Sequence, residues 1–161
     1  MFKTLESKIN LASGLLWFLQ LVALAIHLLF IPATASHLAA VYVEYSGDAV
    51  TIQVLLSLIV VSSQVVLWAV WKLLERIKTR QLLDASSIGD VRLLASGSFA
   101  VSAFFFALMV WLIMQNTLPP FLSAGFIVAM VVGVAVGLVT MALKQVLLEA
   151  IAARDELEGV I

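Results

Sequence analysis

Four long stretches of the chain contain no Asp, Glu, Lys or Arg, and they cover residues 11–31, 50–71, 94–114 and 121–143. A helix of ~20 apolar residues crosses the hydrocarbon core of a bilayer, whereas barrel strands are about half as long and alternate polar with apolar residues. A helix that is apolar all round must face lipid or other apolar helices. The sequence therefore predicts an all-α integral membrane protein, a single domain over residues 1–161 built as a four-helix bundle.

The composition narrows the classes of function. Of the 161 residues, 63% are hydrophobic and 12% are charged, which leaves no room for a separate soluble catalytic domain. The chain has no Cys, so disulfides, thiolate metal sites and iron–sulfur clusters are excluded. The net charge of −1 gives no footprint for direct nucleic-acid binding. Because the sequence has no catalytic triad, metal-ligand pair or phosphate-binding Gly loop, we expect neither an enzyme nor a cofactor.

All Lys and Arg residues lie before the first stretch, between the second and third, or after the fourth. Short loops rich in Lys and Arg stay in the cytoplasm. We therefore expect a multi-pass cell-membrane protein with both termini and the central loop in the cytoplasm, and with outer loops at residues 32–49 and 115–120. Ala33-Thr34-Ala35 is similar to a signal-peptidase site, but the apolar stretch before it exceeds the ~7–15 residues of a signal peptide, so we expect the first helix to be retained.

Cytoplasmic extensions are predicted for the second and fourth helices. Residues 72–80 and 144–157 have helix-forming composition and contain no Gly or Pro. After the first of these segments, Ser87 and Asp90 have the Ser-x-x-Asp spacing of a helix cap. We therefore expect the third helix to start near Ile88. The Ser87 hydroxyl should accept a hydrogen bond from a first-turn amide, and the positive end of the helix dipole should stabilise the Asp90 carboxylate.

From about residue 67 to residue 161 the chain resembles the YoaS-like proteins, an uncharacterised family of small bacterial four-helix membrane proteins. Three features carry the resemblance: Trp71-Lys72-Leu73-Leu74-x-x-Ile77 with Leu94 downstream, Leu118-Pro119-Pro120, and Leu147-x-Glu149-Ala150 followed by acidic residues. The resemblance implies four helices in the orientation given above. It also implies a small Xre-type helix-turn-helix protein as a cytoplasmic partner, because members are often encoded beside such proteins. It implies no established activity.

Polar side chains inside the predicted spans are the candidates for intramembrane chemistry: Gln20, His27, Ser57 and Gln64. Helical spacing brings them to matching depths on antiparallel neighbours, which predicts an interhelical hydrogen-bond seam. The alternative is a haem or metal ligand at His27, for which the second imidazole, His37, lies in the outer loop without supporting carboxylates. We prefer the seam. Since the spans hold no acid, a proton-coupled multidrug exporter is disfavoured.

Small residues recur every four positions along the fourth helix, at Gly125, Ala129, Gly133 and Gly137. Such a ridge lets two helices approach closely. We favour packing within the bundle, against Ser98 and Ser102 of the third helix. The alternative is an interface between copies of the chain in a homo-oligomer.

A candidate contact for a partner or for lipid lies beside the cytoplasmic surface, at Lys72, Arg76, Lys78, Arg80, Leu147, Glu149 and Ile151. The bases can hold anionic lipid of the bilayer. They can also receive the acidic end of the chain at Asp155, Glu156 and Glu158, although exposed pairs contribute only ~0.2–1 kcal/mol each. Leu143, Leu147 and Ile151 share one helix face, as expected of a stripe packed on another helix.

This anatomy predicts a regulatory or scaffold protein of the membrane that binds a cytoplasmic protein. The alternative is a small transporter, a channel, or an immunity protein against a membrane-active peptide. Co-purification with an Xre-type protein would favour the first hypothesis. A growth phenotype confined to toxic solutes or peptides would favour the second.

Overall fold

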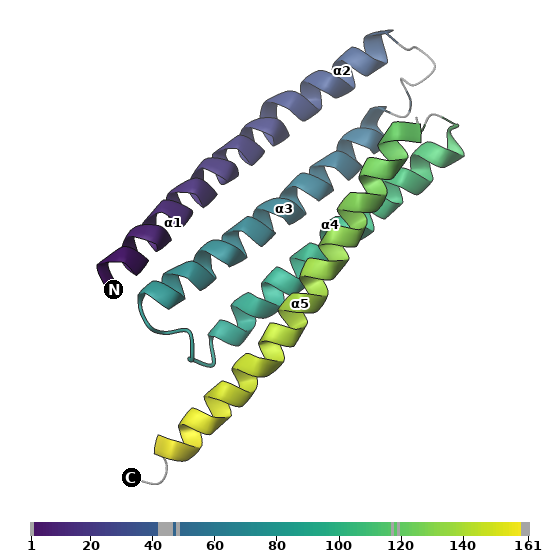
Figure 1. Cartoon of the computed structure of the whole chain (residues 1–161). Helices are drawn as coiled ribbons and strands as arrows, with labels where there is room; N and C mark the ends of the chain where they lie inside the picture. The colour runs from purple at the N-terminus through teal and green to yellow at the C-terminus, as the bar shows by residue number, and fades with distance from the viewer. Residues whose placement is uncertain (1, 42–46, 48, 117, 119, 159–161) are drawn as a thin grey trace.

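The computed structural model describes residues 2–41, 47, 49–116, 118 and 120–158, and these residues form helices and turns without a strand. The helical elements are α1 (Phe2–Ala25), the π-helical turn η1 (Ile26–Phe30), α2 (Ile31–Val41), α3 (Ala49–Lys78), α4 (Ser87–Met114) and α5 (Pro120–Glu158) (Figure 1). The N-terminal end of α1, the turn between α3 and α4, and the C-terminal end of α5 lie at one end of the molecule (Figure 1). We call this end, with its α3–α4 turn at residues 79–86, the charged end.

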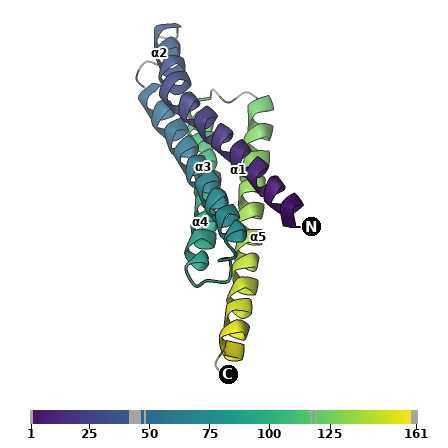
Figure 2. The same cartoon turned by 90° about the vertical axis from the view of Figure 1, so that its left-hand side faces the viewer.

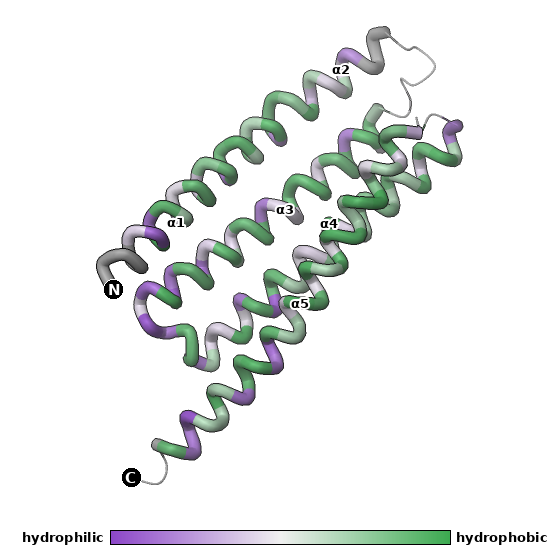
Figure 3. The backbone as a smooth tube through the Cα atoms, in the orientation of Figure 1, coloured by the Kyte–Doolittle hydropathy of each residue, from purple (hydrophilic) through white to green (hydrophobic). Residues whose placement is uncertain are grey.

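Four helices are long and apolar enough to cross a membrane, namely Ser7–His37, Ala49–Lys78, Ser87–Met114 and Pro120–Leu157. Each is at least as long as the ~20 residues that the hydrocarbon core requires. Apolar residues dominate the middle of these helices, and polar residues gather at the α3–α4 turn and toward the end of α5 (Figure 3). The prediction of an all-helical chain with four potential membrane spans is confirmed.

The first span is one continuous rod made of α1, η1 and α2, so the prediction that an outer loop begins at Pro32 is wrong. The π-helical turn ends at Phe30, two residues before Pro32, and the Ile31 amide donates to the Ile26 carbonyl, five residues back. A proline has no amide and its ring collides with the carbonyl four residues earlier in a regular helix. A widened turn at this place lets the helix pass the proline. His37, predicted in a loop, therefore lies on α2, where it is exposed.

The helices pack side by side in chain order. The extensive contacts join α3 to α4 and α4 to α5, while α1 and α2 pack on α3. Figure 1 shows α1 and α5 on opposite sides of α3, and in the view of Figure 2 α1 crosses in front of the other helices. As a result, α3 is the helix that connects the first span to the α4–α5 hairpin.

Most residues buried between α3, α4 and α5 are small, among them Ala69, Ala95, Gly97, Ser98 and Ser102. Small side chains let helix backbones approach closely, which is how helices associate where lipid removes the hydrophobic drive. Ser102 Oγ donates to the Met130 carbonyl at 3.1 Å and so joins α4 to α5. Large apolar side chains such as Val128 and Leu138 are exposed on the outer surface, as expected of a surface that faces lipid.

Candidate functional site: the Asp90 cluster at the charged end

The α3–α4 turn begins with a well-defined helix end. The Gln81 amide donates to the Arg76 carbonyl at 2.9 Å, and the Arg80 amide donates to the Ile77 carbonyl at 3.3 Å. This pair of bonds is a Schellman motif, which places its C′ residue in the left-handed region. Arg80 holds that position with φ 59°, where glycine is the usual residue. The motif ends α3 and turns the chain toward α4.

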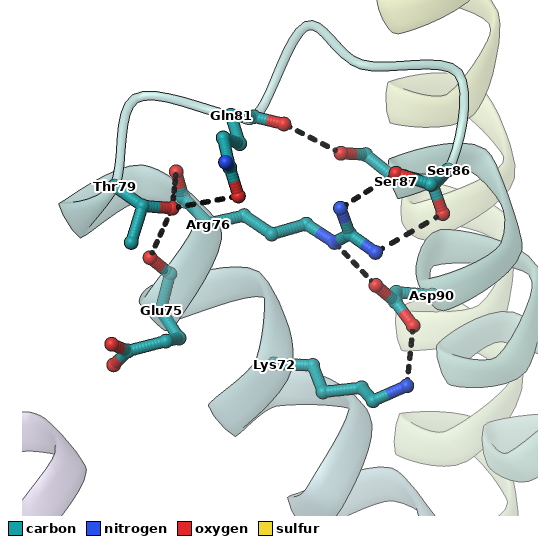
Figure 4. Close-up of polar contacts among 8 residues, drawn as sticks. All are labelled: Lys72, Glu75, Arg76, Thr79, Gln81, Ser86, Ser87 and Asp90. Carbon is teal, nitrogen blue, oxygen red and sulfur yellow. Dashed lines mark hydrogen bonds and ion pairs between the residues drawn. The ribbon is translucent and has the colours of Figure 1, made fainter.

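Asp90 lies in the first turn of α4 and binds two bases of α3 (Figure 4). Its Oδ1 accepts from Lys72 Nζ at 3.3 Å, and its Oδ2 accepts from Arg76 Nε at 2.5 Å. The Asp90 side chain is 8% exposed, against 35% for Lys72 and 22% for Arg76. A carboxylate this buried requires such partners, because an unpaired buried charge is strongly unfavourable.

Two serines complete this group, which we call the Asp90 cluster: Lys72, Arg76, Gln81, Ser86, Ser87 and Asp90. Arg76 Nη1 donates to Ser86 Oγ at 2.8 Å, and Ser87 Oγ donates to the Gln81 carbonyl at 3.1 Å. Ser87 is fully buried. The bonds of Asp90 join α4 to α3, the Arg76–Ser86 bond joins α3 to the turn, and the Ser87–Gln81 bond joins α4 to the turn. The cluster therefore holds the α3–α4 hairpin closed at the charged end (Figure 4).

The predicted cap at Ser87 and Asp90 is wrong in its contacts. The N-cap residue of α4 is Ser86, and its side chain makes no capping hydrogen bond. The Ser87 hydroxyl donates to a carbonyl of the turn, and the Asp90 carboxylate is taken by two cations. A hydrogen bond between two charged groups is stronger than a bond to a neutral backbone amide. The Asp90 carboxylate therefore binds the two cations and not an amide of the first turn. The helix itself starts at Ser87, close to the predicted residue.

Aromatic side chains lie beside the cluster on the side that faces the apolar part of the molecule. Lys72 Nζ lies 4.2 Å from the centre of the Trp68 ring, a cation–π contact. The rings of Trp17 and Trp71 meet edge to face at 5.8 Å and join α1 to α3. A cavity of about 260 Å³ lies next to Trp71, and its walls include Lys72, Glu75 and Arg76. Tryptophan beside basic residues is typical of the membrane–water interface.

An ion pair links the far part of α5 to the α3–α4 turn. Arg154 Nη1 lies 4.0 Å from Asp84 Oδ1 in the α3–α4 turn, and both side chains are about half exposed. Of the predicted apolar stripe, Leu147 and Ile151 are half-buried and Leu143 is exposed. Glu149 is exposed.

The predicted tie between the basic residues of α3 and the acidic end of α5 is wrong for Lys72 and Arg76, which pair with Asp90. Asp155 and Glu156 are exposed, and the side chain of Glu158 lies outside the described residues. Lys78 and Arg80 are exposed beside the turn. The bases nearest the apolar part therefore stabilise the hairpin, and the α5 acids Glu149, Asp155 and Glu156 are exposed.

The four polar residues of the spans lie on two neighbouring helices. Gln20 on α1 and Gln64 on α3 line the same groove, and Gln20 Oε1 and Gln64 Nε2 are buried without a hydrogen-bond partner. His27 is half-buried in the π-helical turn, and Ser57 is half-buried on α3. Within the described part of the chain, no hydrogen bond connects these four side chains, so the seam stays a prediction. No group of three His, Asp or Glu side chains in that part could hold a metal ion.

The small-residue ridge of α5 makes its close contacts at two positions. A Cβ at Gly133 would collide with Ser102 Oγ and lie 3.1 Å from the Ser98 carbonyl, and one at Gly137 would lie 2.8 Å from the Phe99 ring. A Cβ at Gly125 would meet nothing within 4 Å, and Ala129 is half-buried. At Gly133 and Gly137, therefore, the ridge faces α4. Sequence reasoning missed Gly97, where a Cβ would lie 2.9 Å from Val66 Cγ2 on α3.

The role of Asp90 was also missed, although the sequence holds a signal for it. Lys72 and Arg76 are one helical turn apart, and a short turn follows before Asp90. An antiparallel hairpin brings the last turns of one helix beside the first turn of the next, so these charges reach the same depth. The Ser-x-x-Asp spacing is typical of a local helix cap, and this interpretation does not consider the pairing of Asp90 with Lys72 and Arg76.

The four apolar helices and their charged end define a multi-pass membrane protein. The chain belongs to the family described as "Protein of unknown function (DUF2975)", whose model matches residues 1–161. The narrower resemblance to YoaS-like proteins stays a prediction. No curated protein and no solved structure matches the chain.

Proposed function

We propose that this protein is a membrane-resident regulatory or scaffold module whose charged end faces the cytoplasm and binds a cytoplasmic protein. The orientation is supported by the position of the basic residues, which lie at the charged end and not at the α4–α5 turn. A small Xre-type helix-turn-helix protein is the partner that the family resemblance suggests.

The observation that carries the proposal is the length of α5. This helix has 39 residues, and at ~1.5 Å per residue it is about twice as long as the ~30 Å hydrocarbon core. Its last part continues past the α3–α4 turn in both views (Figures 1 and 2). Among the described residues, the partly exposed pair of Arg154 with Asp84 links it to that turn.

The surface of this last part suits a protein contact. Val146 and Leu157 are 62% and 73% exposed, although they lie beyond the apolar span that would cover such side chains with lipid. Glu149 and Glu156 are exposed beside them. An apolar surface rimmed by charge outside the membrane is typical of an interaction site.

Truncation tests the proposal. Removing residues 149–161 should leave the four spans inserted, because insertion depends on hydrophobicity and on loop charge near the spans. In a pull-down from native membranes at matched expression, the full-length chain should recover a cytoplasmic protein that the truncated chain loses. The matched control removes only residues 159–161 and keeps α5 as described, so it should retain the partner.

If full-length and truncated chains recover the same cytoplasmic proteins, or if neither recovers any, the proposal fails. The small transporter, channel or immunity protein would then be the function to test. Its readout is growth of cells that lack the chain in the presence of toxic solutes or membrane-active peptides.

A further inference from the structure

The cavity beside Trp71 lies where α3 changes from apolar to charged residues. The uncharged stretch of α3 ends at Trp71, and the next residue, Lys72, is the first base. Phospholipid phosphates and glycerol groups occupy the interfacial layer just outside the hydrocarbon core. The cavity holds about 260 Å³ and lies among Trp71, Lys72, Glu75 and Arg76, with Asp90 also contributing to its wall.

The charges around this cavity are divided into two parts. The first part consists of Lys72, Arg76 and Asp90. Two cations share one carboxylate there, so these three residues together keep a net positive charge. The Glu75 carboxylate is half-buried on the same wall and forms neither an ion pair nor a hydrogen bond within the described residues. It points away from Asp90, while its backbone carbonyl accepts from Thr79 (Figure 4). The wall of the cavity thus carries a net positive group and, on its other side, a carboxylate without a partner among the described residues.

This arrangement discriminates between headgroup types. The four charged groups, Lys72, Arg76, Glu75 and Asp90, sum to zero, so a purely anionic headgroup would meet two carboxylates and leave Glu75 unpaired. A zwitterionic headgroup brings a phosphate for the positive part and a cation for Glu75. A primary ammonium offers three hydrogen-bond donors, whereas choline offers none.

We propose that this cavity binds the headgroup of phosphatidylethanolamine from the leaflet at the charged end. The phosphate lies against Lys72 and Arg76, the ammonium pairs with Glu75, and the acyl chains run along the apolar surface below Trp71. The site is independent of the proposed protein partner, because it lies on α3 and needs no residue of α5.

Native mass spectrometry of the full-length chain tests this assignment. The detergent-solubilised protein is offered an equimolar mixture of phosphatidylethanolamine, phosphatidylglycerol and phosphatidylcholine with identical acyl chains. Phosphatidylethanolamine should be retained over each competitor by roughly threefold, the contribution expected of one partly exposed ion pair. Equal retention of the three lipids, or preference for phosphatidylglycerol, would overturn the proposal.

Variants locate the selectivity. Glu75→Gln should abolish the preference without unfolding the chain, because Thr79 bonds to the Glu75 backbone carbonyl and the carboxylate has no partner among the described residues. Glu75→Lys should reverse it toward phosphatidylglycerol. The matched control, Glu149→Gln, removes an exposed carboxylate on α5 and should change nothing. If Glu75→Gln and Glu75→Lys still prefer phosphatidylethanolamine over the other two lipids, the lipid binds elsewhere and the assignment is wrong.

Discussion

Arg76 Nε lies 2.5 Å from Asp90 Oδ2, and this ion pair joins the end of α3 to the first turn of α4. Lys72 binds the other carboxylate oxygen, so one buried acid neutralises part of two cations. The same bases would also mark the cytoplasmic side of the membrane by the positive-inside rule. One set of residues thus serves the packing of the hairpin and, in our proposal, the orientation of the chain.

Replacing Asp90 tests the cluster. Asp90→Asn leaves Lys72 and Arg76 without their counter-charge, and breaking a fully buried pair costs about 3–5 kcal/mol. Because both cations keep some exposure here, we expect a loss of about 2 kcal/mol in the free energy of unfolding. Thermal unfolding in detergent measures the effect, with the exposed Asp155→Asn as the neutral control. An equal response to both substitutions would show that the cluster adds no stability.

The sequence predicted the parts of the fold that hydrophobicity decides. The start of α3 and the last residue of α4 fall within one residue of the predicted spans, and α4 starts one residue before the predicted Ile88. Charges and the Pro119-Pro120 pair limit the apolar stretches at these places. The continuation of the first rod through Pro32 was not predictable by the same rule. A proline usually ends a helix, and the π-helical turn that avoids the clash depends on five residues whose composition is ordinary.

The ridge of α5 gives a second prediction, with a control on the same helix. Gly133→Ala places a methyl group against Ser102 Oγ and the Ser98 carbonyl, and overpacking of this kind costs about 1–3 kcal/mol. Gly125→Ala enters open space and should be neutral or slightly stabilising, since Ala is the better helix former. The midpoint of thermal unfolding should therefore fall for the first variant alone. Equal midpoints would mean that α4 and α5 are not in close contact at Gly133.

The third prediction concerns the side-chain amides of Gln20 and Gln64, which are buried within the apolar helices. Gln64 Nε2 is buried without a partner, and an unsatisfied buried polar group costs about 1–3 kcal/mol. We expect Gln64→Met to raise the free energy of unfolding by about 1 kcal/mol, whereas Gln53→Met, at a half-buried position of the same helix, should have a smaller effect. A drop in stability at Gln64 would contradict this and would support the hydrogen-bond seam with Gln20.

The candidate site was only partly accessible to sequence reasoning. Helical spacing identified Gly133 and its neighbours Ser98 and Ser102, because one periodic pattern on one helix carries that information. The pairing of Lys72 and Arg76 with Asp90 depends on the length and path of the α3–α4 turn, including the left-handed residue Arg80. Local spacing does not reveal such a path, so these bases were assigned to lipid, to a partner or to the acids of α5.

The fourth prediction concerns the orientation of the chain in the membrane. Because the sequence has no Cys, a single introduced Cys is the only thiol that a reagent can label. Gln115→Cys lies at the α4–α5 turn and Ala85→Cys at the α3–α4 turn, and both positions are exposed. An impermeant thiol reagent added to intact cells should label only the first, because in the proposed orientation the Lys and Arg residues keep the charged end in the cytoplasm. Labelling of Ala85→Cys from outside would reverse the orientation and remove the proposed cytoplasmic partner.

Photocrosslinking in intact cells tests the proposed partner contact most directly. A photoreactive amino acid placed at Glu149 or Glu156, both exposed on the far part of α5, should give a discrete adduct with one cytoplasmic protein after illumination. The same amino acid at Val128, which is exposed in the apolar part of α5, should give no such adduct. Absence of a protein adduct at both acidic positions, at expression equal to that of the control, would contradict the account.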